Sequence, residues 1–237
     1  MNDLTVWCVC VGTKYPNYYV LALRDMVVKH LTIPYEFKCI TPRKIPGVIC
    51  VPPHVPYQGW WGKINLFSPG MAVGPSIYFD LDVVITGNLD YLADYTEGRF
   101  AAPANWAQSG HGGIQSSVMA WPGNWHAPFH KIKPLWLFKQ DLESGHTMLG
   151  GRPYWGDQEF IGAIVGDDWD RLPGIGSYKY HVMGKNIPDW MRVCVFHGQP
   201  KPHEVSDKCM LPFTSILRSH INASKQSGSR QDLSASA

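Results

Sequence analysis

Ser76-Ile77-Tyr78-Phe79-Asp80-Leu81-Asp82 is a short apolar run that ends in two acidic residues. A buried strand with polar residues at its carboxyl end is typical of open α/β sheets, whose ligands bind at that edge. Carboxylates at i and i+2 point the same way from a strand and suit a hard divalent cation. Two aspartates can also simply end a strand, but here apolar residues continue at Val83-Val84-Ile85. Unpaired carboxylates between apolar stretches are costly, so the segment predicts a bound cation.

The N-terminal residues predict a Rossmann-like start. Leu4–Val11 is a continuous apolar run that ends at Gly12, as expected for a buried strand of a parallel sheet. Residues 17–30 carry apolar side chains at helical spacing, and Tyr35–Ile40 reads as a second strand. Strand, helix and strand in this order indicate an α/β crossover. No G-x-G-x-x-G motif follows the first strand, which disfavours an ordinary dinucleotide-binding fold.

The remaining patterns complete one α/β domain. We expect further strands at 48–51, 100–102, 114–121 and 193–196, and helices at 64–67, within 125–149 and at 156–165. The domain is predicted to span residues 1–212. Residues 213–237 form a C-terminal extension, which we expect to be disordered from about residue 224 because it is rich in Ser, Gln, Gly and Ala.

Composition places the chain among globular proteins. Of its 237 residues, 17% are charged and 45% are hydrophobic, and the net charge of +2 neither requires nor excludes a nucleic-acid partner. The six cysteines form no C-x-x-C pair, so we expect reduced thiols. The apolar run near the N-terminus is too short for a signal peptide or a membrane span, and the expected location is the cytoplasm.

A second polar cluster follows the strand predicted at 193–196. His197, Gly198 and Lys201 come directly after it. A lone histidine at a strand end is more often a structural residue, but two carboxylates and an imidazole together suit Mn²⁺, or Mg²⁺ somewhat less. We therefore expect Asp80, Asp82 and His197 to bind the metal. Gly198 would let the backbone approach a phosphate, and Lys201 would neutralise charge on a leaving group.

The two clusters carry a resemblance to a known family. Asp80-Leu81-Asp82 and His197-Gly198-Gln199-Pro200-Lys201-Pro202 resemble the D-x-D and H-x-G-x-x-K-P motifs of glycogenin and of bacterial lipopolysaccharide glucosyl- and galactosyltransferases. Gly12-Thr13-Lys14-Tyr15 is also similar to a segment of short phage and bacterial members. The resemblance extends from the first strand to about Lys201. It implies one GT-A domain with a Rossmann-like, mixed central sheet, a metal ion, transfer with retention, and a bacterial or phage-infected host.

The resemblance assigns roles to individual residues of the N-terminal half. Val11, Gly12 and Thr13 would take the nucleotide, with Tyr15 or Tyr18 stacking on the base. Asp80 would hold the metal beside the diphosphate, which Gly198 and Lys201 contact.

Further positions match the family's sugar subsite. Asp157 and Gln158 fall where the family has an Asp-Gln pair near the transferred sugar, and Asp157 would stabilise the positive charge that develops there. Gln115 stands where the family has asparagine. Lys63 is a candidate for phosphate binding, although a surface lysine at a helix start explains it equally well. His203 replaces the family's usual tryptophan.

The resemblance implies a hexosyltransferase that uses a UDP-sugar and a hydroxyl acceptor. Two acceptor classes stay open: modified DNA such as 5-hydroxymethylcytosine, and a glycan or lipopolysaccharide-type precursor. The segment Leu211–Ile221 is short and only partly basic, so we expect no stable insertion into a membrane.

Two other functions remain alternatives. Phe79-Asp80-Leu81-Asp82 also resembles the nucleophile motif of haloacid dehalogenase-type phosphatases, with Gly166-Asp167-Asp168 as their acidic metal motif. This motif lies far from the first strand, and Val83-Val84 replaces the usual Gly-Thr. The tryptophans would instead suit a non-catalytic sugar-binding module, namely Trp60, Trp61, Trp106, Trp121 and Trp125.

Overall fold

The computed structural model describes residues 4–57, 59–106, 113–131, 147–149, 152–154 and 156–234. The chain divides into two compact units. Unit 1 consists of Met1–Lys14, Ile33–Asp80 and Asp90–Pro173, and unit 2 of Tyr15–Thr32, Leu81–Leu89 and Gly174–Ala237. The chain therefore passes between the units several times, and the two aspartates of the D-x-D segment belong to different units.

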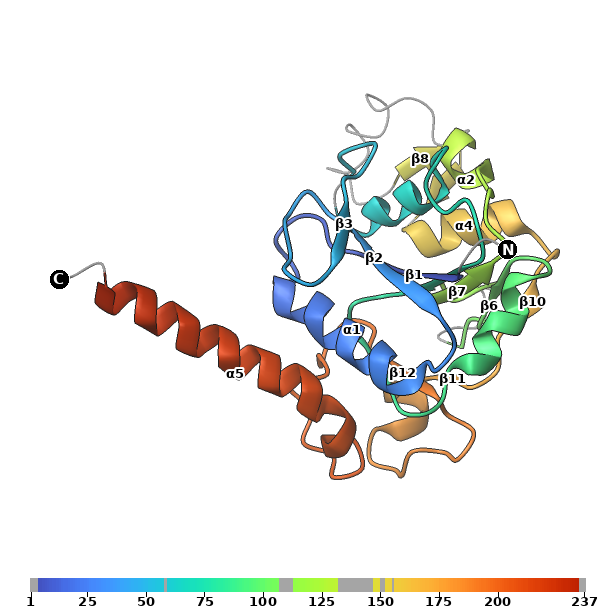
Figure 1. Ribbon diagram of the computed structural model, residues 1–237. Helices are drawn as coiled ribbons and strands as arrows, with labels where there is room; N and C mark the ends of the chain where they lie inside the picture. The colour runs from blue at the N-terminus through green and yellow to red at the C-terminus, as the bar shows by residue number, and fades with distance from the viewer. Residues whose placement is uncertain are drawn as a thin grey trace. The chain divides into compact units, whose positions relative to one another are not determined.

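Unit 1 is built on a mixed sheet (Figure 1). Among the described residues its strand order is β10-β6-β7-β4-β1-β2-β3. The strands are β1 (Leu4–Val9), β2 (Tyr35–Ile40), β3 (Ile49–Val51), β4 (Ser76–Phe79), β6 (Ala101–Ala102), β7 (Val118–Trp121) and β10 (Asp170–Arg171). Strand β7 is antiparallel to both of its neighbours, and the other pairs are parallel. A mixed central sheet is what the family resemblance implies.

The central position of β1 in this sheet explains the apolar run at the start of the sequence. Val6 of β1 lies opposite Phe37 of β2 and Ile77 of β4, so β1 has a strand on each side. Val6 and Ile77 have no exposed surface. A strand buried on both faces needs apolar residues at consecutive positions, and this is the pattern of the first run. The parallel strands β1 and β4 end at one edge, where Gly12 and Asp80 follow them.

Helical segments and one hairpin complete unit 1. They are η1 (Gly59–Phe67), η2 (Asp90–Thr96), α2 (Ala127–Lys131), α4 (Asp157–Val165) and the pair β8 (Thr147–Leu149) and β9 (Arg152–Tyr154). Trp61 of η1 meets Phe160 of α4 edge to face, with ring centroids 5.8 Å apart. Buried aromatic rings thus fix α4 against η1. Residues 132–146 of the predicted helix lie outside the described residues.

Unit 2 contains a smaller sheet, of which the sequence predicts the strand at 193–196 but not the pairing. Its order among the described residues is β11-β12-β5, with β11 (Ile175–Ser177), β12 (Val193–Val195) and β5 (Val83–Ile85). Strand β5 is antiparallel to β12, with Val83 opposite Val195. A three-residue strand carries little local signal, and its partner lies far along the chain. Unit 2 also contains α1 (Asn17–His30), which has the predicted bounds, and the short helix η3 (Tyr178–Val182).

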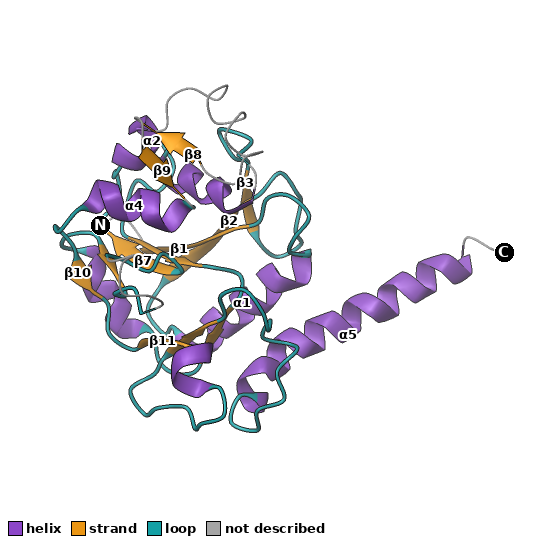
Figure 2. Cartoon of the chain, turned by 180° about the vertical axis from the view of Figure 1, so that it is seen from behind, coloured by secondary structure: helices purple, strands orange, loops and turns teal. Residues whose placement is uncertain are grey.

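The C-terminal helix α5 (Leu211–Ser234) differs from the prediction (Figure 2). It continues past residue 224, where we expected disorder to begin. Its first turns are anchored in unit 2, because Leu217 is buried and His220 Nε2 lies 2.7 Å from Asp25 Oδ2 of α1. Asn222–Gln226 are exposed. Extending an existing helix costs far less than starting one, so an anchored helix can continue through a polar sequence. No helix in the described part of the chain has the length and apolarity to cross a membrane.

Candidate active site

Lys63 is the centre of a buried ion cluster in unit 1. The η1 segment places this lysine under the carboxyl end of β4, and only 5% of its surface is exposed. Its Nζ lies 3.1 Å from Asp80 Oδ1 and 2.7 Å from Asp157 Oδ2. The predicted metal-binding aspartate and the predicted sugar-binding aspartate therefore share one lysine. The interpretation of Lys63 as a surface lysine is therefore wrong, because its side chain is buried.

Backbone and hydroxyl groups complete this cluster. Lys63 Nζ also donates to Ser116 Oγ at 3.0 Å and to the Ser116 carbonyl at 3.1 Å. The Ser116 hydroxyl donates to Asp157 Oδ2 at 2.9 Å, and the Tyr78 hydroxyl donates to Asp80 Oδ1. Asp157 is the first residue of α4, where the helix dipole favours a negative charge. Each charged group thus has several partners, which a buried ion cluster requires.

The cluster keeps Asp80 and Lys63 charged. Burial by itself would raise the pKa of Asp80, but the Lys63 ammonium and the hydrogen bonds from Tyr78 and Ser117 outweigh it and lower this pKa. Burial would likewise lower the pKa of Lys63, yet Asp157 and Asp80 raise it above its usual range. Burial next to Asp80 raises the pKa of Tyr78. At neutral pH Asp80 is therefore a carboxylate and Lys63 an ammonium.

Unit 2 contains a second cation–carboxylate cluster, formed by Asp82, Lys201 and Tyr15. Lys201 Nζ lies 2.7 Å from Asp82 Oδ2, and the Tyr15 hydroxyl donates to the same oxygen at 2.7 Å. Lys201 Nζ also donates to the Tyr15 hydroxyl at 3.0 Å. Asp82 is only 8% exposed. The cluster forms because Asp82 precedes β5, whose partner β12 leads into the H-x-G-x-x-K segment.

His197 lies at the same edge of the small sheet. The Phe196 amide donates to the Asp82 carbonyl at 3.2 Å, which holds the start of β5 beside the end of β12. The His197 Nε2 atom is 2.7 Å from Ser177 Oγ, and its ring stacks on Tyr180. Burial and the Lys179 and Lys201 ammonium groups lower the pKa of His197, with Asp82 opposing them. A neutral imidazole is the form that coordinates a metal.

The residues predicted to bind the nucleotide belong to two different units. Val11, Gly12 and Thr13 follow β1 in unit 1, and Gly12 has a φ of 67°, which favours glycine. Tyr15 and Tyr18 belong to unit 2, where Tyr18 stacks on Tyr19 with centroids 5.3 Å apart. The Tyr15 hydroxyl contacts Asp82, a partner that the sequence does not indicate.

The other predicted residues have definite positions. Gln115 is 7% exposed and exchanges two hydrogen bonds of 2.8 Å with Ser117, so its amide shapes the segment that precedes β7. Gln158 Oε1 accepts from the Ser116 amide at 3.4 Å. Gly198 has a φ of 73°. His203 donates to or accepts from the Tyr19 hydroxyl at 2.9 Å.

Among the described residues, no three His, Cys, Asp or Glu side chains form a group ready to hold a metal ion. Instead each aspartate of the D-x-D segment holds an ammonium group, Lys63 on Asp80 and Lys201 on Asp82. At each carboxylate an ammonium group provides the positive charge that a metal ion would otherwise supply. Carboxylate oxygens and imidazole nitrogens are ligand types that suit Mn²⁺ or Mg²⁺.

The phosphatase alternative required Asp167 and Asp168 near Asp80. They follow the carboxyl end of α4, whereas the Lys63–Asp80 cluster contacts Asp157 at the other end of this helix. Asp168 pairs with Arg99 instead. The described residues therefore do not form the acidic metal site of that class.

Comparisons with known proteins support the fold. No family model and no curated protein sequence matches the chain. A crystal structure of galactosyltransferase LgtC, in complex with donor and acceptor sugar analogues, is similar with a TM-score of 0.61 at 14% identity over 91% of this chain and 95% of that one. Glycosyltransferase GlyE of Streptococcus pneumoniae TIGR4 has a TM-score of 0.64 at 14% identity, over 94% of this chain and 65% of GlyE. The bifunctional glycosyltransferase WbbM has a TM-score of 0.58 at 12% identity, over 93% and 50%.

The chain has the GT-A fold. In this GT-A chain, the mixed sheet of unit 1 places Asp80 at the carboxyl end of β4, where the sequence predicts a ligand site. The predicted fold class is thereby confirmed.

Sequence reasoning missed Ser116 and Tyr78, which complete the Lys63 cluster. A polar residue directly beside a predicted site residue is a weak signal that could have found Ser116, the neighbour of Gln115. Tyr78 lies two residues before Asp80 and so points the same way from the strand.

Proposed function

We propose that this chain is a metal-dependent glycosyltransferase that moves a hexosyl group from a UDP-sugar to a hydroxyl acceptor with retention of configuration. The observation that supports this most is the pairing of each D-x-D aspartate with a lysine. At Asp82 a divalent cation can displace the Lys201 ammonium, which can then pair with the charged diphosphate. The GT-A fold adds to this argument.

In unit 1, Asp157 is the residue proposed to act at the transferred sugar. Lys63 and Ser116 hold its carboxylate in place, so it can stabilise positive charge at the sugar carbon without changing position. Gln158 is the neighbouring candidate for hydrogen bonds to sugar or acceptor hydroxyls. In the reaction the bond from the sugar carbon to the diphosphate breaks while the acceptor oxygen bonds to the same face. The acceptor proton leaves with the diphosphate oxygen.

In unit 2, Lys201 is the residue proposed to change partners. Its ammonium pairs with Asp82 in the free protein and would pair with the diphosphate when the donor binds. Gly198 would leave room for the phosphates, and Asp80, Asp82 and His197 would hold Mn²⁺ or Mg²⁺. That ion supplies Lewis-acid neutralisation of the departing diphosphate.

A donor screen tests the proposed activity. Incubated with UDP-hexoses and Mn²⁺, the protein is expected to release UDP, and EDTA is expected to stop the release. NMR of the transferred sugar then reports the anomeric configuration, which we expect to match that of the donor. Turnover that is unaffected by EDTA would contradict the metal requirement, and an inverted product would contradict retention.

Lys201→Met provides a binding test that does not depend on turnover. This substitution removes the ammonium that competes with a cation at Asp82, so Mn²⁺ alone is expected to bind more tightly than to the wild type. UDP in the presence of Mn²⁺ is expected to bind about tenfold or more weakly, because a charge-assisted hydrogen bond contributes about 1.5–3 kcal/mol. Isothermal titration calorimetry measures both affinities.

The matched control is Lys208→Met, an exposed lysine of the same unit. It should leave both affinities unchanged. Weaker Mn²⁺ binding by the Lys201→Met variant would show that Lys201 does not compete for Asp82.

For the acceptor we propose a hydroxyl group that is carried either by hydroxymethylated DNA or by a glycan. A DNA acceptor would need a base rotated out of the duplex and would make turnover sensitive to salt. Mass spectrometry after incubation with UDP-hexose and Mn²⁺, with 5-hydroxymethylcytosine DNA and soluble oligosaccharides as alternative acceptors, identifies the modified one. Rates on DNA that stay constant between low and moderate salt would argue against DNA.

A further inference from the structure

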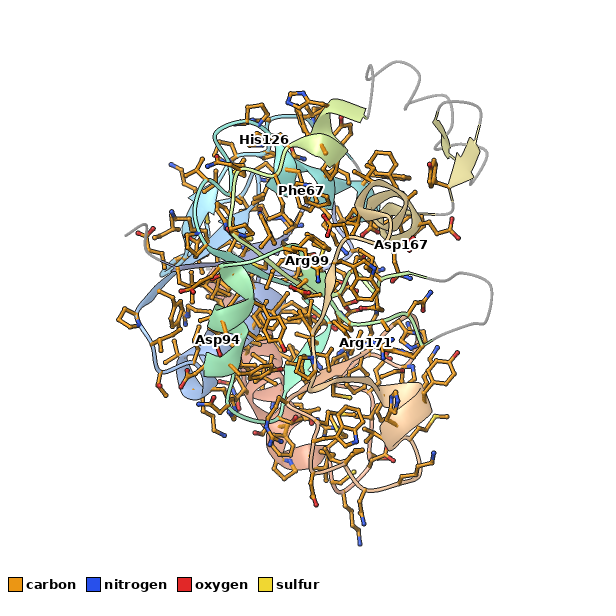
Figure 3. The ribbon with its side chains drawn as sticks, turned by 90° about the vertical axis from the view of Figure 1, so that its right-hand side faces the viewer. Phe67, Asp94, Arg99, His126, Asp167 and Arg171 are labelled. Carbon is orange, nitrogen blue, oxygen red and sulfur yellow. The ribbon has the colours of Figure 1, made fainter. Side chains whose placement is uncertain are left out.

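Unit 1 has a cavity of about 340 Å³ at the edge of its sheet where β7 ends and β6 and β10 begin. Its lining comes from the segment before β6, the residues after β7, and the end of α4. The volume is at the low end of the range for small-molecule sites, about 300–1,000 Å³. Figure 3 labels Arg99, one of the residues that line it.

This cavity is separate from the Lys63 cluster. Trp121, which lines it, lies opposite Ser76 at the start of β4, whereas Asp80 follows the end of β4. Helix α4 shows the same separation. Asp157 is its first residue, and Val165, a second lining residue, is its last. A nine-residue helix is about 13 Å long. A ligand in the cavity would therefore not occupy the proposed sugar subsite at Asp157.

An aromatic wall forms one side of the cavity. Trp125 is half-buried and packs on Phe100, with ring centroids 4.6 Å apart, and on Phe67 at 5.1 Å. These contacts hold the indole in one orientation. A fixed ring can stack on the apolar face of a sugar without losing much side-chain freedom on binding.

Polar groups form the rim. Arg99 Nη1 donates to Asp168 Oδ1 at 3.0 Å, and both side chains line the cavity. Asn124 lines it too, and its Nδ2 donates to the Val73 carbonyl at 2.8 Å. This bond directs the amide, and its Oδ1 atom is left as an acceptor. The rim thus offers donors and acceptors together, with one positive and one negative side chain.

The charge balance narrows the class of ligand. Asp168 and the end of α4, together with Asp170, which also pairs with Arg99, disfavour phosphates and other anions, while the Arg99 guanidinium disfavours simple cations. An aromatic wall with mixed donors and acceptors suits an uncharged ring that carries several hydroxyl groups. We propose that this cavity is a saccharide-binding subsite, separate from the proposed donor site. Its binding of a saccharide does not depend on whether transfer occurs at the donor site.

Asn124→Gly is the most informative variant. Asn124 has a φ of 53°, a conformation that glycine adopts without strain, so the substitution removes the amide without stressing the backbone. Saturation-transfer NMR and Trp fluorescence titrations would use glucose, galactose, N-acetylglucosamine, lactose and cellobiose as probes. At least one of these is expected to bind the wild type, and the variant is expected to bind it about fivefold or more weakly, because a hydrogen bond is lost.

The controls separate this site from the proposed donor site. Asn186→Gly, at an exposed position in unit 2, should leave saccharide binding unchanged. UDP with Mn²⁺ should not displace the sugar, and displacement would show that the sugar occupies the donor site instead.

Asp168→Asn is a second variant that keeps the side-chain size, and it too should weaken binding. The proposal is overturned if no probe binds, or if binding is unaffected in both Asn124→Gly and Asp168→Asn.

Discussion

Replacing Asp82 by alanine is expected to lower sugar transfer at least about a thousandfold. The proposed metal contributes several kcal/mol to the transition state, and each 1.36 kcal/mol corresponds to about a tenfold change in rate. Asp82 is also the partner of Lys201, with 2.7 Å between Nζ and Oδ2. Its removal therefore affects both the proposed metal and the lysine proposed to meet the diphosphate. The measurement is kcat and KM for a UDP-hexose with Mn²⁺.

Two comparisons make this result interpretable. Asp82→Asn keeps the size of the side chain but not its charge, and it should be nearly as inactive as the alanine variant. Asp94→Ala, at an exposed position, should keep the wild-type rate. Circular dichroism and thermal unfolding check that the Asp82 variants are folded. A folded Asp82→Ala protein with wild-type turnover would refute the role assigned to the D-x-D segment.

Replacing Lys63 by methionine is expected to destabilise the protein by about 3–5 kcal/mol. Lys63 is 5% exposed and is the common partner of Asp80 and Asp157. Without it, two carboxylates remain close together without their cation, and breaking a buried ion pair in this way has a cost of that size. Denaturant unfolding at 25 °C measures the free energy of unfolding, with the m-value as a check on two-state behaviour.

Two further variants isolate the cause. Lys38→Met removes a more exposed lysine that lies 2.7 Å from Glu36, and such surface pairs contribute about 0–1 kcal/mol. Adding Asp157→Asn to Lys63→Met removes one of the two uncompensated charges and should recover part of the loss. A Lys63→Met protein as stable as the Lys38→Met protein would contradict this account of the cluster.

The pH dependence of stability follows from the direction of the Asp80 shift. In the wild type the pKa of Asp80 is lowered, because Lys63 and two hydrogen bonds outweigh burial. Its contribution to stability is therefore present above the unfolded pKa of about 4 and is lost as the pH falls through the folded value. In the Lys63→Met variant the pKa of Asp80 should rise instead. The stability gap between the two proteins should then narrow as the pH is lowered toward 4.

Much of the fold could be predicted because its signals are local. Helix α1 and strands β2 and β4 have the predicted bounds, since each is a continuous run whose apolar period is readable without its neighbours. Strand β5 was not predicted, because three apolar residues after a turn fit several structures. The extent of α5 was also missed, since an anchor at Leu217 and His220 cannot be read from the polar residues that follow.

The polar residues that follow each strand can be read from the order of residues alone, and with them the α/β class and the candidates Asp80, Asp82, His197 and Lys201. Their partners depend on how distant segments pack together. Lys63 meets Asp157 because η1 and α4 pack on one sheet, and Lys201 meets Asp82 because β5 pairs with β12. Such partners depend on the register of segments that lie far apart in the chain, and that register is set by the packing of the whole core rather than by local propensity.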